Sequence, residues 1–163
     1  MKPALMAIGI PGSGKTTVLK PLAEDYGLAY VNRDDIRAEL LGDATDQSAN
    51  RRVWEEANRR TLAALAAGQG VVLDSTFVEA WKRREMIELL REAGASPIVG
   101  VLCLVPLGVA RKRNAARERV VPEDVLEQMH AKLAKQPPTA DEGFDALVTL
   151  DELTERLKTL LPA

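Results

Sequence analysis

The most informative segment of this chain is Gly9-Ile10-Pro11-Gly12-Ser13-Gly14-Lys15-Thr16-Thr17. It fits the pattern G-x-x-x-x-G-K-[ST], with an apolar run before it at residues 4–8 and a helical pattern after it. Glycines let the backbone turn tightly and point several N–H groups at one anion, which a Cβ atom would obstruct. The positive end of the following helix dipole faces the same spot. The segment therefore predicts a strand, a phosphate-binding loop and a helix.

Each polar residue of this loop has a chemical task. Lys15 can bridge the two outer phosphates of a nucleotide as a point charge, and the Thr16 hydroxyl is placed to ligate a Mg²⁺ ion that bridges them too. The sequence therefore predicts ATP or GTP as donor and Mg²⁺ as cofactor. The predicted nucleotide-binding residues are Gly9, Pro11, Gly12, Ser13, Gly14, Lys15, Thr16 and Thr17. The alternative is a glycine-rich turn that binds nothing.

Short apolar runs alternate with longer helical patterns along the rest of the chain. This alternation is typical of an α/β fold in which helices cover both faces of a parallel sheet. The predicted strands are residues 4–8, 28–31, 70–74, 98–105 and 144–150. The predicted helices are residues 15–26, 34–41, 46–67, 79–93, 107–117, 122–135 and 151–161.

Length and composition limit the classes of protein. A chain of 163 residues fits one domain, so we expect a single domain over residues 1–163. Its formal net charge of -2 argues against coating nucleic acid by bulk charge, because such binding neutralises many phosphates. The one cysteine, Cys103, allows no intrachain disulfide and favours a reducing compartment. With no apolar run near the ~20 residues that cross a bilayer, we expect a cytoplasmic protein without a membrane partner.

A phosphate-binding loop alone does not separate a kinase from a switch GTPase or a motor ATPase. Switch GTPases need a base-reading N-K-x-D element, which this sequence lacks, and motor ATPases usually need a longer chain. A transferase acting on a hydroxyl fits the length better. Such an enzyme needs a base beside the acceptor, a positive clamp on the transferred phosphoryl group, and a lid that excludes water.

Candidates for the acceptor side follow the second and third predicted strands, at the edge of the sheet where ligands dock in open α/β folds. Asp34 and Arg37 are three residues apart and would share one face of a helix. That spacing could present the Asp34 carboxylate to an acceptor hydroxyl and Arg37 to an anionic part of the acceptor. Asp74 could organise Mg²⁺ through a water molecule or hold the acceptor. The alternative is that Asp34, Asp35 or Asp74 only caps a helix.

Candidates for the clamp and the lid lie at about residues 111–122. Arg113 and Arg117 are four residues apart on one face of the predicted helix, and a loop follows them. Two guanidiniums on a hinged segment could neutralise the oxygens of the transferred phosphoryl group. A solvated basic face is the alternative.

Together these motifs resemble the polynucleotide 5′-hydroxyl kinase family of P-loop phosphotransferases and related ATP-dependent kinases. The resemblance rests on the phosphate loop, Asn32-Arg33-Asp34-Asp35-x-Arg37, Asp74, and Arg113-Asn114-x-x-Arg117 followed by Val121-Pro122-x-x-Val125. It implies a P-loop kinase fold, with a parallel sheet of about five strands and a small helical lid. It also implies ATP-dependent transfer to the 5′-hydroxyl of DNA or RNA.

The resemblance implies a role for each matching residue. Asp34 would be the general base and Arg37 the contact to the phosphate next to the acceptor hydroxyl. Asp74 would organise the acceptor or the metal, and Arg113 with Arg117 would clamp the donor phosphates, beside the catalytic Lys15. Arg83 and Arg84 fall at no family spacing and receive no role.

Two other functions stay open at this stage. One is a kinase for a small metabolite, a nucleoside or a sugar nucleotide, which the acidic net charge and the lack of stacking aromatic residues favour. The other is a non-catalytic nucleotide-binding module. The spacing of Asp34 and Arg37 favours a nucleic-acid end as acceptor. The sequence leaves the oligomeric state undetermined.

Overall fold

The predicted strands form one parallel sheet in the computed structural model, which describes residues 1–161. The strands are β1 (Ala4–Ile8), β2 (Ala29–Asn32), β3 (Val71–Asp74), β4 (Ile98–Leu102) and β5 (Ala146–Thr149). Their order across the sheet is β2-β3-β1-β4-β5, and all four neighbouring pairs are parallel. The predicted fold class is confirmed.

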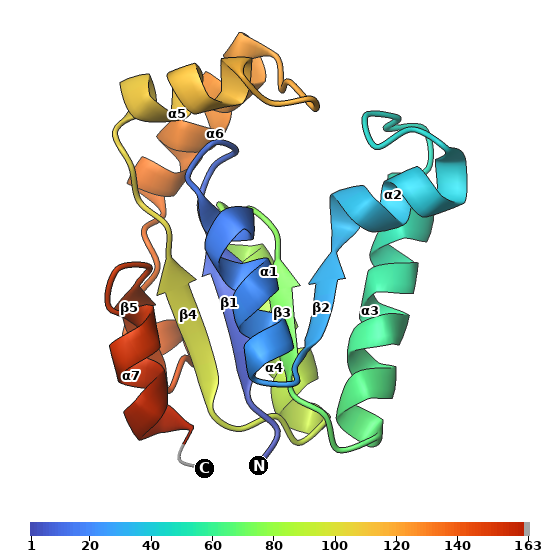
Figure 1. Cartoon of the computed structure of the whole chain (residues 1–163), viewed down its shortest axis with the longest axis vertical. Coiled ribbons are helices and arrows are strands. Elements are labelled where there is room, and N and C mark those ends of the chain that lie inside the picture. Colours follow the sequence, from blue (N-terminus) through green and yellow to red (C-terminus); the bar gives the residue numbers. More distant parts are fainter. Residues whose placement is uncertain (162–163) are drawn as a thin grey trace.

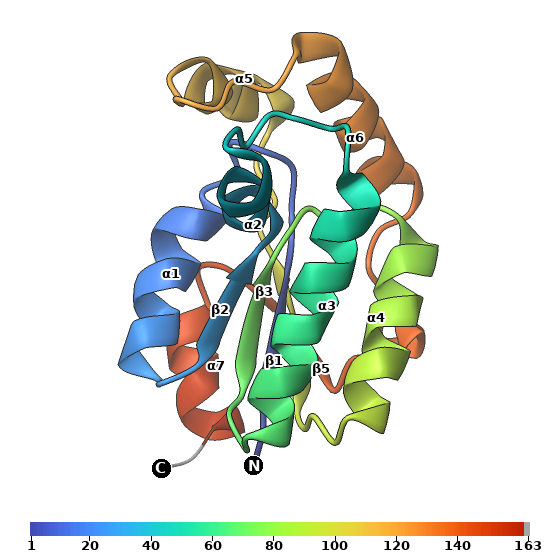
Figure 2. The same ribbon diagram turned by 90° about the vertical axis from the view of Figure 1, so that its right-hand side faces the viewer.

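Helices cover both faces of the sheet (Figure 2). They are α1 (Lys15–Asp25), α2 (Arg33–Leu41), α3 (Asn50–Ala66), α4 (Ala80–Glu92), α5 (Leu107–Ala115), α6 (Glu123–Lys135) and α7 (Leu153–Leu160), with a short 3-10 helix, η1 (Ala140–Glu142). Alternate residues of β1 explain the two layers, because successive side chains of a strand point to opposite faces. Met6 packs in the core cluster of α3 and α4, whereas Leu5 packs in that of α1 and α7. Within residues 1–161, no helix has the length and apolarity needed to span a bilayer.

The register of the strands brings the candidate site together. Because the strands are parallel, their carboxyl ends lie at the same edge of the sheet, and α2 and α5 lie beyond that edge (Figure 1). Asn32 at the end of β2 is paired with Asp74 at the end of β3. The amide of Gly9, the first residue after β1, donates to Thr76 O at 3.0 Å. The phosphate loop and the ends of β2 and β3 are therefore neighbours.

Two predicted helices have different ends in the structure. The helix predicted at residues 46–67 begins at Asn50, because Asp46 accepts a hydrogen bond from the Ser48 amide at 2.8 Å and holds a turn there. The helix predicted at residues 107–117 ends at Ala115, so Arg117 lies beyond it. The prediction that Arg113 and Arg117 share one helical face is therefore wrong.

A buried ion pair connects three segments behind the site. Arg83 of α4 is fully buried, and its Nε donates to Glu142 at 2.8 Å. Its other nitrogens donate to the carbonyl oxygens of Phe77 at 2.8 Å and Gln136 at 2.6 Å. One guanidinium thus joins the loop after β3, the end of α6 and η1. The Phe77 backbone, with φ of 44°, is held in a left-handed conformation at this point.

We expect Arg83→Met to lower the free energy of unfolding by about 3–5 kcal/mol, because Glu142 would stay buried without its cation. Arg84→Met is the matched control, since Arg84 is half exposed and lies 3.8 Å from Asp141. Its loss should stay below about 1 kcal/mol. Equilibrium urea denaturation measures the free energy of unfolding of both variants. Equal decreases would show that the buried ion pair contributes no more to stability than the exposed one.

Candidate functional site

The phosphate loop is shaped by two glycines with left-handed backbone conformations. Gly12 has φ of 85° and Gly14, the N-cap of α1, has φ of 88°. The first turn of α1 has no side-chain cap, so its N–H groups are available to an anion. Pro11 and Ser13 are buried behind the loop, whereas Thr17 is exposed at the start of α1.

Close backbone contacts hold this loop in place. A Cβ atom at Gly9 would lie 2.7 Å from Cys103 O, just after β4. A Cβ atom at Gly12 would lie 2.5 Å from Ala110 O in α5. Both distances are too short for any side chain, so the loop requires glycine for packing as well as for conformation. The contact at Gly12 also fixes α5 against the loop.

Lys15 lies among the charges of four different segments. Its ammonium group is 3.5 Å from Ile10 O, and burial lowers the pKa of Lys15 below its ordinary value. The Asp74 carboxylate opposes this lowering most strongly, and Asp34 opposes it weakly. Arg117 lowers the pKa further by repulsion. The phosphate loop, the end of β3, α2 and the segment after α5 therefore share one electrostatic environment.

Asp74 is the buried hub of the site. Its Oδ2 accepts hydrogen bonds from the Thr16 hydroxyl at 2.7 Å, from the Tyr30 hydroxyl, and from the Asn32 amide at 3.3 Å. Burial, together with the contact to Asp74, raises the pKa of Tyr30 above its ordinary value. Asp74 does not cap α4, whose N-cap is Glu79, so that alternative is wrong.

The same two groups fit a magnesium ion. Asp74 Oδ1 is buried and has no hydrogen-bond partner among the described residues. The Thr16 hydroxyl lies beside the same carboxylate. Residues 1–161 contain no cluster of three acidic, histidine or cysteine side chains that could hold a metal alone. In nucleotide sites Mg²⁺ is usually bound by one or two protein oxygens, several waters and the phosphates of the nucleotide. Asp74 and Thr16 can supply the protein oxygens of such a site.

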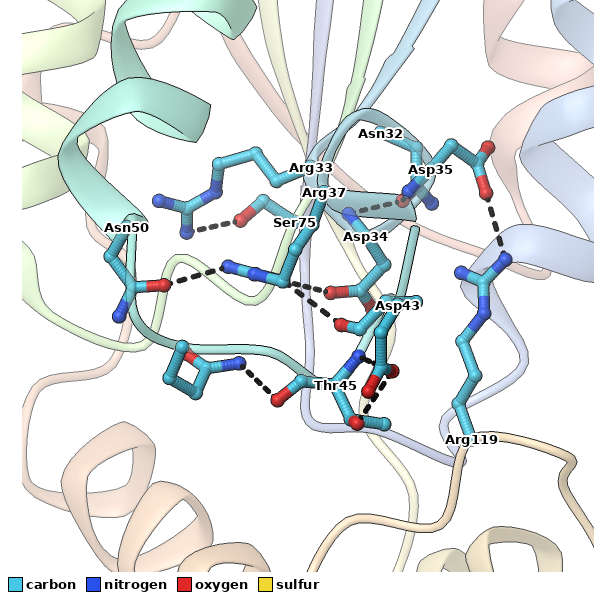
Figure 3. A network of polar contacts seen from close by, with 12 residues as sticks. Asn32, Arg33, Asp34, Asp35, Arg37, Asp43, Thr45, Asn50, Ser75 and Arg119 are labelled. Atoms are coloured by element: carbon cyan, nitrogen blue, oxygen red, sulfur yellow. Dashed lines mark hydrogen bonds and ion pairs between the residues drawn. The ribbon is translucent and has the colours of Figure 1, made fainter. Parts of the chain in front are cut away.

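The start of α2 presents Asp34 without using it as a cap (Figure 3). The Asn32 side chain caps the helix, accepting from the amides of Asp34 at 2.9 Å and Asp35 at 3.1 Å. The cap alternative for both aspartates is therefore wrong. Asp34 instead forms an ion pair of 2.7 Å with Arg37, which is buried and also donates to Asn50 at 3.2 Å. The carboxylate of Asp34 is 46% exposed, so it stays open to a ligand.

The two arginines after the phosphate loop reach it by different routes. A Cβ atom at Gly14 would lie 3.4 Å from a guanidinium nitrogen of Arg113, which places that group against the loop. Arg117 follows α5, and its positive charge lowers the pKa of Lys15. Neither arginine forms an ion pair with an acidic side chain of residues 1–161.

Sequence reasoning gave no role to several residues of the site. Tyr30 and Asn32 of β2 both contact Asp74. Residues two positions apart on a strand point to the same face, and this spacing could have predicted that the two side chains lie together. Asn114 is buried and forms two hydrogen bonds with the backbone of Val121, at 2.8 and 3.0 Å, which close the loop after α5. Arg119 in this loop pairs with Asp35 at 3.1 Å. No local sequence pattern predicts a contact between two residues that are 84 positions apart in the chain.

Comparisons with known proteins agree with this arrangement. A family model described as AAA domain matches residues 5–137. The cytidylate kinase of Aeropyrum pernix is 34% identical over 123 residues, which cover 71% of this chain and 64% of that protein. The chain therefore spans less than two thirds of the length of this relative.

Two solved structures share the fold. A putative kinase from Chloroflexus aurantiacus has a TM-score of 0.72 at 18% identity and covers 98% of each chain. A chain of the Pnkp1/Rnl/Hen1 RNA repair complex has a TM-score of 0.74 at 22% identity, covering 88% of this chain and 46% of that one. The sheet and helices described above are thus those of a P-loop kinase fold.

We expect Gly12→Ala to lower the free energy of unfolding by about 2 kcal/mol or more, because the new Cβ meets a backbone oxygen and the backbone is left-handed. Gly108→Ala is the control, since a Cβ there has no atom within 4 Å and Gly108 lies in α5. It should be neutral or stabilising by up to about 1 kcal/mol. Urea denaturation that ranks the two variants the other way would contradict the close packing of α5 on the loop.

Proposed function

Since the chain belongs to the AAA domain family, whose model matches residues 5–137, we propose that it is an ATP-dependent kinase that transfers a terminal phosphoryl group to a hydroxyl. One observation carries this proposal. Thr16 of the phosphate loop and Asn32, which caps the helix that carries Asp34, donate to the same oxygen of Asp74, and a guanidinium nitrogen of Arg113 lies against Gly14 of the loop. A base, a clamp and a donor site in one environment are the parts that phosphoryl transfer requires.

The donor side holds the phosphates. The N–H groups at the start of α1 and the ammonium of Lys15 bind the outer phosphates of the nucleotide. Thr16 and, through water, Asp74 would hold Mg²⁺, which when bound neutralises charge on the phosphates. Binding of these anions favours the charged form of Lys15, which burial alone disfavours.

The clamp and the lid come from about residues 111–122. Arg113 lies against the loop, and the charge of Arg117 lowers the pKa of Lys15, so in this mechanism both guanidiniums neutralise the oxygens of the transferred group. The segment that carries them excludes water from the donor phosphates, which limits hydrolysis.

The acceptor side provides the base. The Asp34 carboxylate accepts the proton of the attacking hydroxyl, and a weak base is sufficient because a loose transition state releases that proton late. Arg37, anchored by Asn50, orients this carboxylate and contacts the acceptor. Our first candidate acceptor is the 5′-hydroxyl of DNA or RNA, on the strength of the motif around Asp34.

A small-molecule acceptor is the second candidate, and the similarity to the cytidylate kinase of Aeropyrum pernix favours it. Between α3 and the sheet, next to Asp74, lies a narrow space of about 20 Å³, which is room for about one water molecule. Arg33, Trp54 and Phe77 are among its lining residues, and the Arg33 guanidinium lies 5.4 Å from the centre of the Trp54 ring. This space is too small to hold an acceptor, so the second candidate rests on the similarity alone.

Labelled ATP separates these acceptors. The protein is incubated with labelled ATP, Mg²⁺ and either a short 5′-hydroxyl oligonucleotide of DNA or RNA, or a panel of nucleosides, nucleoside monophosphates and small hydroxy acids. Label on the oligonucleotide supports the first candidate, and label on a panel compound supports the second. Label on neither, with nucleotide bound, would leave a nucleotide-binding module without transferase activity.

We expect Asp34→Asn to reduce transfer at least about 100-fold, because the amide cannot accept the acceptor's proton. Nucleotide affinity should be nearly unchanged, since Asp34 lies on the acceptor side. Steady-state transfer and equilibrium nucleotide binding check the two expectations. Asp25→Asn, an exposed change in α1, should leave both unaffected. Unchanged turnover of Asp34→Asn would remove this residue from the mechanism.

For the clamp, we expect Arg117→Ala to slow the rate of transfer about 100-fold or more, with a smaller loss of nucleotide affinity. Lys112→Ala removes an exposed charge from the same segment and serves as the matched control. Single-turnover rates with saturating nucleotide make the comparison. Equal rates for the two variants would show that Arg117 has no role in transfer and that the basic segment is only a solvent-exposed surface.

A further inference from the structure

An ion pair spans the site between α2 and the loop after α5 (Figure 3). Nη2 of Arg119 lies 3.1 Å from Oδ1 of Asp35, and each side chain is 40% exposed. Asp35 follows the proposed base in the first turn of α2, and Arg119 lies two residues after Arg117. The pair is therefore at the rim of the acceptor side.

The loop that carries Arg119 is held by contacts that do not involve Asp35. The buried Asn114 amide binds both backbone groups of Val121, which fixes the far end of the loop. Arg111 of α5 forms ion pairs with Glu123 and Glu127 of α6, which brace the two helices on either side of the loop. A guanidinium carried by a braced loop is preorganised for a ligand.

Asp35 is a weakly held partner for this guanidinium. A half-exposed ion pair contributes only about 0.2–1 kcal/mol. The contact uses one nitrogen of Arg119, whereas a guanidinium has five N–H donors in a fork that suits phosphate and carboxylate. Another anion that arrives with a bound ligand can thus replace Asp35 at low cost.

The charges around the site indicate what would replace it. Lys15, Arg113 and Arg117 have no ion-pair partner in the described part of the chain, and the proposed donor phosphates occupy all three. Asp34 is already paired with Arg37. Arg119 is then the cation at the rim whose present partner is a neighbouring carboxylate that ligand binding can displace.

We propose that Arg119 binds an anionic group of the acceptor, a phosphate or a carboxylate, and that Asp35 occupies this guanidinium when the acceptor is absent. This inference rests on the proposed function and adds a specificity to it. The acceptor carries a negative charge near its reacting hydroxyl, and an uncharged analogue binds without displacing Asp35.

Three related probes test the inference by equilibrium binding in the presence of ADP. Cytidine 3′-monophosphate represents a nucleic-acid 5′-hydroxyl end, cytidine 5′-monophosphate represents a small charged acceptor, and cytidine is the uncharged analogue. Isothermal titration calorimetry gives each affinity for the unmodified protein, Asp35→Asn, Arg119→Gln and the double variant.

The two single changes should act in opposite directions on whichever monophosphate binds. Asp35→Asn removes the internal competitor and should tighten binding about two- to fivefold. Arg119→Gln removes the charged contact and should weaken binding about tenfold or more. In the Arg119→Gln background, Asp35→Asn should have a smaller effect. Cytidine affinity should not change in any variant.

Other outcomes would overturn the inference. If both single changes weaken binding, the pair only closes the cleft. Equal affinity of the unmodified protein for cytidine and both monophosphates, or no binding of any of them, would remove the anion site. Glu155→Gln and Lys158→Gln, an exposed pair on α7, are controls for a general charge effect. Unfolding midpoints of all variants should match, because both residues of each pair are exposed.

Failure of the proposed function gives a different result. If a monophosphate binds with the expected opposite shifts but labelled ATP transfers no phosphoryl group to it or to an oligonucleotide, the anion site stands and the kinase assignment fails. If transfer occurs but both variants shift affinity in the same direction, the kinase assignment stands and the role of Arg119 fails.

Discussion

The hydrogen bond from the Thr16 hydroxyl to Asp74, 2.7 Å long, joins the phosphate loop to the end of β3. The proposed donor and acceptor sites can act together only because the phosphate loop and the end of β3 are this close. Tyr30 and Asn32 bind the same carboxylate oxygen and bring the end of β2, and hence the start of α2, to the same place. The parallel register of β2, β3 and β1 makes these contacts possible, because it aligns the carboxyl ends of the three strands.

Two groups of residues with opposite charge meet at the carboxyl edge of the sheet. The phosphate loop, α5 and the segment after it supply three cations that have no acidic partner in residues 1–161, Lys15, Arg113 and Arg117, and this suits a triphosphate. The start of α2 supplies two carboxylates, each already paired with an arginine. A donor and an acceptor can therefore enter from different sides. The proposed exchange of partners at the Arg119 guanidinium would couple acceptor binding to the segment that carries Arg117.

The sequence was sufficient for the sheet because buried parallel strands are apolar runs, and each predicted strand lies within a few residues of an observed one. It was also sufficient for the loop, whose glycines and lysine have local roles. It was insufficient where a distant contact decides the outcome. The end of α5 depends on the bonds of Asn114 to Val121, and the role of Arg83 depends on Glu142, 59 residues away. The pairing of Arg119 with Asp35 has the same origin.

The most direct measurement is a crystal structure with a non-hydrolysable ATP analogue, Mg²⁺ and an acceptor that the labelling experiment identifies. We predict that the Asp34 carboxylate lies within about 3.2 Å of the acceptor hydroxyl oxygen, and that this oxygen faces the terminal phosphate in line with its leaving group. An acceptor bound with its hydroxyl away from Asp34, or an Asp34 carboxylate separated from the terminal phosphate by packed side chains, would contradict the mechanism.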